Sequence, residues 1–241
     1  PCTVRNIFEQ GESDVYLVTF TDGAAAECGP DHNWLVRGSG CTHWQTLTVR
    51  EMIARHGETP YSDNAMRIPL VQPVEFEERY HHIAPYVVGA MLGDGTLGWN
   101  TEVRICTTER EILEQIKNAM PAIDIVARSD NDYLLRDLGP VWGCRTPIDQ
   151  EFMRLKLRGC LSRDKFIPEE YLFDSVENRI ELLRGLMDTD GSIYGKCAME
   201  YSTMSRQLAL DVVQLVQSLG GKAHIKEKRA ICCKKDGVKK D

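Results

Sequence analysis

Two similar nine-residue stretches, 96 residues apart, constrain the fold of this chain more than any other feature. Residues 87–95 read VVGAMLGDG and residues 183–191 read LRGLMDTDG, so each is a largely apolar run with an internal glycine and a terminal Asp-Gly pair. A glycine inside a helix costs about 1 kcal/mol relative to alanine, which indicates that another backbone passes close by. We therefore predict two helices that pack through Gly89 and Gly185 and bring the aspartates before the terminal glycines side by side.

Those aspartates, Asp94 and Asp190, are the predicted metal ligands. Two carboxylates held close together repel each other unless a cation or a shared proton lies between them, and Mg²⁺ is a cation that carboxylates bind. The backbone carbonyls of Gly93 and Thr189 are expected to complete the site. The alternative is a pair of ordinary helix C-caps, which accounts for the glycines but not for aspartates placed against the helix dipole.

At these residues the chain resembles the LAGLIDADG homing endonucleases, closely in the second stretch and more loosely in the first. The resemblance implies a site-specific endonuclease that hydrolyses phosphodiester bonds in double-stranded DNA at a long asymmetric target. It implies catalytic roles for Asp94 and Asp190, with Mg²⁺ as the cofactor and Mn²⁺ as a substitute. The alternative from another class is a DNA-binding module that has kept this fold and lost cleavage.

The family also places a lysine near the metals in each half. Lys165 matches the first of these, because it stands before an Ile-Pro pair, 25 residues ahead of Asp190. The alternative is a solvated lysine in the charged run Arg163-Asp164-Lys165. The repeat would put the second lysine at position 261, and the sequence ends at Asp241, so we expect an incomplete second half.

The first 37 residues have β character. Residues 15–20 alternate and are rich in β-branched side chains, and an Asp-Gly pair at 22–23 is a hairpin signal. The following Asp-His-x-Trp-Leu segment is similar to the protein-splicing (Hint) domain of inteins, which implies that His32 assists the first acyl shift. The alternative is a packed histidine beside Trp34. Gly29 stands where that family has a threonine, and Cys2 lies too near the hairpin to be the splicing nucleophile, so we expect a piece of an intein that does not splice alone.

Helical spacing over residues 47–56 follows, with Thr46 or Thr48 as the cap. After residue 80, an apolar helix, an alternating strand at 101–107 and a helix at 112–120 are repeated in order by a strand at 197–203 and a helix at 205–219. We predict an α+β protein in which a partial all-β Hint-like segment precedes a pseudo-two-fold, duplicated αββαββα domain. The predicted divisions are 1–79 for the Hint segment and connector, 80–175 for the first half-domain and 176–241 for the truncated second.

The net charge of −7 is unusual for a DNA-binding protein, which needs lysine and arginine to neutralise phosphates. Residues 1–79 account for it, with 12 acidic and 6 basic residues. Basic residues gather on the strands that should face DNA and near the C-terminus, although a solvated basic tail is the alternative there. The predicted DNA contacts are Arg104, Arg136, Arg145, Lys222, Lys226 and Lys228.

Other features bound the protein class. No apolar run reaches membrane-spanning length and no signal-peptide pattern opens the sequence. Nine cysteines, an odd number, do not make a disulfide framework in a domain of this size. We expect a soluble monomer in the cytoplasm of a prokaryotic or phage host, with double-stranded DNA and the flanking host-protein segments (exteins) as its partners.

Overall fold

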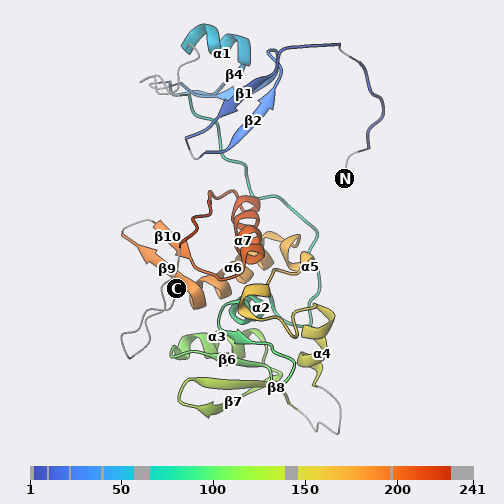
Figure 1. Ribbon diagram of the computed structural model, residues 1–241, viewed down its shortest axis with the longest axis vertical. Helices are drawn as coiled ribbons and strands as arrows, with labels where there is room; N and C mark the ends of the chain where they lie inside the picture. Colours follow the sequence, from blue (N-terminus) through green and yellow to red (C-terminus); the bar gives the residue numbers. More distant parts are fainter. Residues whose placement is uncertain are drawn as a thin grey trace. The chain divides into compact units, whose positions relative to one another are not determined.

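The computed structural model describes residues 3–9, 11–21, 23–38, 41–56, 66–138, 146–195 and 198–228. The chain divides into two compact units, Pro1–Leu70 and Val71–Asp241, which Figure 1 shows. Cys2 and the predicted DNA contact Arg145 lie outside the described ranges.

The first unit contains two antiparallel hairpins and one short helix. Strands β1 (Tyr16–Thr19) and β2 (Ala25–Cys28) form one two-stranded sheet, and β3 (Asn33–Val36) and β4 (Gln45–Thr48) form another. These strands agree with the predicted β character, while a Hint fold remains a prediction.

Helix α1 (Val49–His56) starts two residues later than its spacing predicted. Leu47 lies in β4, opposite Trp34, because ladder pairing takes precedence over helical spacing there. Thr48 is the cap, as one of the two predicted options: its Oγ1 accepts from the Glu51 backbone N–H at 3.2 Å, and its own N–H donates to Glu51 Oε2 at 2.8 Å. This reciprocal pair is a capping box.

The second unit is built around the helices α2 (Pro85–Gly93) and α6 (Val176–Asp190), which lie in the middle part of that unit (Figure 1). Helix α2 is buried on all sides from Tyr86 to Leu92, as expected for a helix that is apolar all round. The first half adds β5 (Gly95–Thr96), β6 (Arg104–Cys106), α3 (Arg110–Ala119), β7 (Ile123–Ser129), β8 (Asp132–Asp137), α4 (Pro147–Arg154), a 3-10 turn at Ser162–Asp164 and α5 (Glu169–Leu172). Its antiparallel sheet has the order β5-β6-β8-β7.

The second half repeats the start of this order with β9 (Gly191–Tyr194), β10 (Ala198–Tyr201) and α7 (Arg206–Ser218). Equivalent hydrogen bonds agree with the predicted duplication. The Cys106 N–H donates to the Asp94 carbonyl at 3.2 Å, and the Ser202 N–H donates to the Asp190 carbonyl at 3.1 Å. Within the described ranges β9 and β10 form a two-stranded sheet, compared with four strands in the first half.

The mixed α and β composition confirms the predicted α+β class. The boundary between the units lies at Leu70 and Val71, earlier than the predicted boundary near residue 80, because the connector packs against the second unit through contacts described below. None of the helices in the described ranges is long and apolar enough to cross a membrane.

Candidate active site at the helix pair

Helices α2 and α6 touch through their glycines, as predicted. A Cβ added to Gly89 would lie 2.2 Å from the Leu182 carbonyl oxygen, and one added to Gly185 would lie 2.1 Å from the Tyr86 carbonyl oxygen. No real Cβ approaches a backbone atom so closely. The two helix backbones are therefore in direct contact, and their C-terminal ends are held at a fixed separation.

The two predicted metal ligands lie at those ends. Asp94 is the C-cap of α2 and Asp190 is the last residue of α6. A Cβ added to Gly93 would lie 3.4 Å from Asp190 Oδ2, so the carboxylate of one helix lies against the last turn of the other. Burial raises the pKa of both carboxyls, and the charge of Asp190 raises that of Asp94 further.

This acidic pair suits a hard divalent cation. No side chain or backbone N–H of the described residues donates a hydrogen bond to either carboxylate, so their oxygen lone pairs are available. Among the described residues, no third Asp, Glu, His or Cys joins Asp94 and Asp190 in a metal-binding cluster. Two carboxylates with carbonyls, waters and a substrate phosphate as the remaining ligands are the donor set that Mg²⁺ prefers.

Lys165 lies beside the pair, and the alternative of a solvated lysine is wrong. Its side chain is 3% exposed. The ammonium donates to three carbonyl oxygens at the end of α2, those of Met91 at 3.1 Å, Gly93 at 2.8 Å and Gly95 at 2.9 Å. Burial lowers the pKa of Lys165 to about 8, against the opposing effect of the two aspartates. Lys165 therefore fixes the backbone that carries Asp94 and places a positive charge next to the site.

The other two predicted ligands have different surroundings. The Gly93 carbonyl, as noted, already accepts from Lys165, which leaves one of its two lone pairs for a metal. The Thr189 hydroxyl donates to the carbonyls of Gly185 and Leu186, both at 3.0 Å. Metal ligation by the carbonyls of Gly93 and Thr189 stays a prediction.

The second half positions Lys165 through residues that sequence reasoning missed. Ser205, the N-cap of α7, donates from Oγ to the Lys165 carbonyl at 2.6 Å. Asp211 on the same helix accepts from the Ile167 N–H at 2.9 Å. The signal for Ser205 was its place at the start of a predicted helix, but its partner is 40 residues away. A further missed residue, Tyr201, lies opposite Gly191 in the β9–β10 pair.

The predicted DNA-contacting residues that the structure describes are spread over both halves, and three have acidic partners. Arg104 pairs with Asp132 at 2.6 Å and Arg136 with Asp124 at 2.8 Å, while Lys228 pairs with Glu200. Lys222 and Lys226 are exposed. The Arg136 and Lys228 pairs are exposed, and exposed ion pairs are worth at most about 1 kcal/mol each, so exchanging their acidic partner for a phosphate costs little. The Arg104 pair is half-buried. The DNA contacts of all these residues remain predictions.

In the first unit, His32 packs edge-on against Trp34 with 5.7 Å between ring centroids. Trp34 also contacts Phe20 at 5.8 Å. His32 is nevertheless exposed, so only this ring contact agrees with the packed alternative, and the splicing role stays a prediction.

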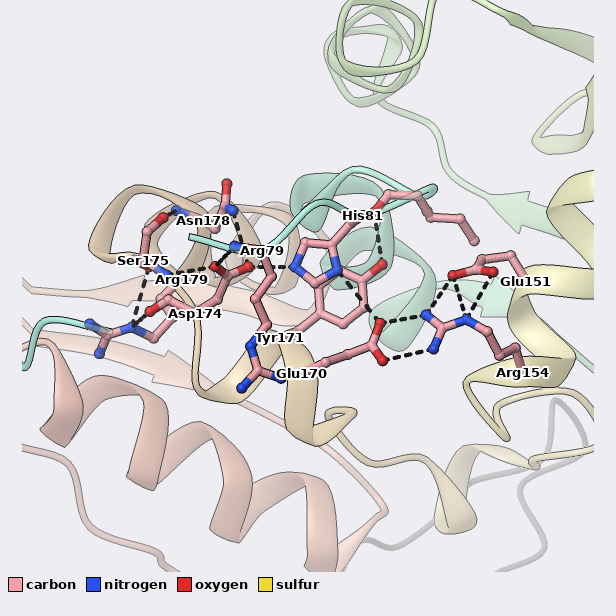
Figure 2. Close-up of polar contacts among 11 residues, drawn as sticks. Arg79, His81, Glu151, Arg154, Glu170, Tyr171, Asp174, Ser175, Asn178 and Arg179 are labelled. Atoms are coloured by element: carbon pink, nitrogen blue, oxygen red, sulfur yellow. Dashed lines mark hydrogen bonds and ion pairs between the residues drawn. The ribbon is translucent and has the colours of Figure 1, made fainter. Parts of the chain in front are cut away.

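A second polar cluster anchors the connector to the second unit, and Figure 2 shows it. At its centre is the fully buried carboxylate of Asp174, just before α6. It accepts from the backbone N–H groups of Arg79 at 2.9 Å and Ser175 at 2.7 Å, and also from His81 Nε2. The His81 ring stacks on Tyr171 with 3.9 Å between centroids. Burial opposes ionisation of Asp174, but these donors outweigh it and lower its pKa.

Arg179 completes the anchor from the first turns of α6. Its guanidinium is fully buried and donates to the carbonyls of Asp174, at 2.9 Å, and Val74, and to Ser218 Oγ at 2.5 Å. It also lies over the Phe76 ring at 5.0 Å. Residues 71–79 are thus held by side chains of the second unit, which is the physical reason why the boundary falls before them.

Replacing Asp174 with asparagine is expected to lower the melting temperature of the second unit by several degrees at neutral pH. In the variant, the amide N–H₂ group would face the donor groups of His81 and Asn178, which now bond to a carboxylate oxygen. Losing these hydrogen bonds costs about 2 kcal/mol of folding free energy. The pKa of Asp174 is lowered in the fold from 3.8, so its stabilisation is present above about pH 3.8 and lost as the pH falls through the folded value. Calorimetry from pH 7 to 3 should show the difference from wild type shrinking below that point. The exposed Asp130→Asn variant is the control, and a difference independent of pH would contradict the assignment.

With this geometry in place, comparison with known proteins finds a family model that matches the C-terminal part of the chain. Residues 177–239 match the model of the LAGLIDADG-like domain. This stretch includes nearly all of α6, Asp190 and α7. The match supports a LAGLIDADG endonuclease or a related DNA-binding module.

Two curated relatives are similar to most of the chain, and both are named replicative DNA helicase DnaB. The protein from Mycobacterium intracellulare is 27% identical over 233 residues, which cover 89% of this chain and 36% of the relative. The protein from Nostoc sp. (strain PCC 7120) is 25% identical over 238 residues, covering 92% of this chain and 26% of the relative. The chain thus spans about a third of one relative and about a quarter of the other.

Proposed function

We propose that this chain carries a site-specific double-strand DNA endonuclease, embedded in an intein, which hydrolyses phosphodiester bonds with Mg²⁺ or, as a substitute, Mn²⁺. The observation that carries the proposal is the pair of half-buried carboxylates, Asp94 and Asp190, brought together by two helices in backbone contact. A carboxylate at a helix C-terminus opposes the helix dipole, and burial adds to that cost. An arrangement so unfavourable to folding is typical of a site that binds a cation.

The chain's own residues have distinct roles in this chemistry. Asp94 and Asp190 would hold the cation, which when bound supplies charge stabilisation for the phosphate and a more acidic water. Lys165 fixes the end of α2 through its three hydrogen bonds and adds a positive charge where negative charge develops on the phosphate. Basic side chains on β6, β8 and after α7 would contact the DNA backbone.

The relatives support the intein context. Nearly the whole chain aligns with proteins named as DnaB helicases but covers a minor part of each. The sequence contains no Gly-x₄-Gly-Lys-Ser/Thr nucleotide-binding pattern, so the shared segment does not carry the phosphate-binding loop of a helicase motor. We infer an insertion in a DnaB-type host protein, with the first unit as part of the splicing domain, His32 as its assisting histidine and exteins on either side. Both half-domains lie in one chain, so we propose a monomer that acts on DNA in the cytoplasm.

Cleavage of the uninterrupted host-gene insertion site tests the proposal. The full-length protein is incubated with a plasmid carrying the helicase gene joined without the insertion, with Mg²⁺ or with EDTA. The matched plasmid carries the gene with its insertion. We expect linear product from the uninterrupted gene with Mg²⁺ alone. Specific binding without cutting would identify a DNA-binding module that has lost cleavage.

Replacing Lys165 with methionine is expected to reduce cleavage by about 10²-fold, because a charge near the developing negative charge is lost while the apolar part of the buried side chain is kept. Single-turnover rates on a saturating target measure the effect. Lys156→Met is the control, since Lys156 is an exposed lysine nearby. Equal rates for the two variants would show that Lys165 has only a structural role.

A further inference from the structure

Two ion pairs at equivalent positions of the half-domains have opposite polarity. Arg104 on β6 pairs with Asp132 at 2.6 Å, and Glu200 on β10 pairs with Lys228. Glu200 follows Arg104 by 96 residues and Lys228 follows Asp132 by 96, which is also the spacing of the two nine-residue stretches. The duplication thus repeats the ion pair, but the strand that carries the basic residue in the first half carries the acidic residue in the second.

The strand register places Arg104 and Glu200 at the same point of their hairpins. Arg104 lies opposite Thr96 and Glu200 lies opposite Ser192, each a small hydroxyl residue. Successive side chains of a strand point to opposite faces of the sheet, and the next residue on each strand packs with the core. Arg104 and Glu200 therefore project from the face turned away from the core. Their side chains are 30% and 39% exposed, so a molecule in solution can reach both.

Each of these two side chains keeps polar groups that its partner does not use. Asp132 accepts from Nη1 of Arg104, and no described residue bonds to Nη2. Lys228 donates to Oε1 of Glu200, and no described residue donates to Oε2. The first half therefore presents hydrogen-bond donors where the second half presents an acceptor. In the major groove, arginine donates to O6 and N7 of guanine, whereas glutamate accepts from the amino group of cytosine.

We propose that Arg104 and Glu200 are specificity-determining residues that make the DNA target depart from two-fold symmetry at one pair of positions. This inference rests on the proposed endonuclease function. Equivalent residues of a protein with two-fold symmetry contact equivalent bases in the two half-sites. Arg104 contacts a guanine base in the first half-site, and not only the DNA backbone. Glu200 contacts a cytosine where a palindromic target would repeat that guanine, and Asp132 and Lys228 are positioning residues that hold the two side chains on the sheet face.

Exchanging the residues of the second pair tests the inference. The double variant Glu200→Arg with Lys228→Asp, made in the full-length protein, has the polarity of the first half and keeps both an ion pair and the net charge. The probes are duplexes that carry the uninterrupted host-gene insertion site and each of its single base-pair substitutions, and their affinities are compared at one salt concentration without metal. At one base pair, we expect the wild type to favour cytosine over guanine by about 10-fold and the double variant to favour guanine by a similar factor.

The reciprocal exchange in the first half, Arg104→Glu with Asp132→Lys, should replace guanine by cytosine at the position related by the pseudo-two-fold axis. Glu200→Gln is the single variant that changes the side chain least. Because glutamine bonds to N6 and N7 of adenine, it should shift the preference at the Glu200 position towards adenine. The matched control is Glu181→Arg with Arg184→Glu, which exchanges an exposed ion pair of 2.6 Å on helix α6. The control should keep the base preferences of the wild type.

Two outcomes would count against the inference, and they differ from each other. Base preferences that stay the same in all these variants, or affinities that change by one factor for every duplex, would overturn it and leave the proposed function intact. The ion pairs would then be surface features or contacts to phosphates. A wild-type protein that binds the insertion site no better than unrelated duplexes would overturn the proposed function, and this inference with it.

Discussion

Replacing Asp94 or Asp190 with asparagine is expected to abolish DNA cleavage and, at neutral pH, to raise the melting temperature. Loss of a carboxylate that holds the cation removes several kcal/mol of charge stabilisation, so the rate should fall by about 10³-fold or more. Stability should change in the opposite direction. The pKa of each carboxyl is raised in the fold above 3.8, so the folded state binds more protons than the unfolded state between those two values. Stability therefore falls as the pH rises through that window, and asparagine removes the penalty that remains at pH 7.

Two measurements check this prediction. Plasmid cleavage gives the rate, and calorimetry with and without Mg²⁺ gives the stability. A bound cation stabilises the folded state, so Mg²⁺ should raise the melting temperature of the wild type more than that of either variant. Asp188→Asn is the matched control, because Asp188 lies on the same helix, where its carboxylate accepts from the Tyr86 hydroxyl at 2.8 Å, and asparagine can still accept there. Substantial cleavage by both active-site variants would show that the pair does not hold the cation.

Gly185→Ala and Gly89→Ala are each expected to destabilise the second unit by about 3 kcal/mol or more. Helix propensity alone favours alanine by about 1 kcal/mol, so the predicted effect has the opposite sign to that of an ordinary helical glycine. The reason is that the new methyl group would overlap a backbone carbonyl of the facing helix, 2.1 or 2.2 Å away. A carbonyl in a helix has no rotamer through which it can move aside, so the helices must separate along their whole contact.

Urea unfolding followed by circular dichroism measures the loss, and the fraction folded at zero urea shows whether the variants fold at all. Gly98→Ala is the control in the same unit, because its added Cβ would meet only the flexible side chain of Thr101, at 3.3 Å. Stabilities equal to wild type for both helix variants would mean that α2 and α6 are further apart than described.

The helix pair could be predicted from the sequence because its determinants are local and occur twice. A glycine in an apolar run and an Asp-Gly at its end can each be recognised within nine residues, and the repeat gave the register between the halves. Lys165 was found by resemblance alone. Its burial and its three carbonyl partners depend on residues 70 to 74 positions away, so no local pattern could distinguish it from a solvated lysine.

The anchor of the connector was missed for the same reason. Asp174 and His81 are separated by 93 residues, and Arg179 and Val74 by 105, so no local pattern indicates either contact. The start of α1 was misplaced because Leu47 fits both the helical spacing and the alternation of β4. The pairing of β4 with β3 decides between them, and a pairing of strands is a tertiary contact.

The backbone contact between α2 and α6 has a consequence for the DNA product. If each carboxylate serves one strand, the stagger between the two nicks is set by main-chain geometry and not by the length or rotamer of any side chain. The helix pair then holds the two carboxylates at a fixed spacing. Substitutions on the surrounding strands can change which sequence is recognised, but the single-stranded ends left behind should keep the same length in every variant that still folds.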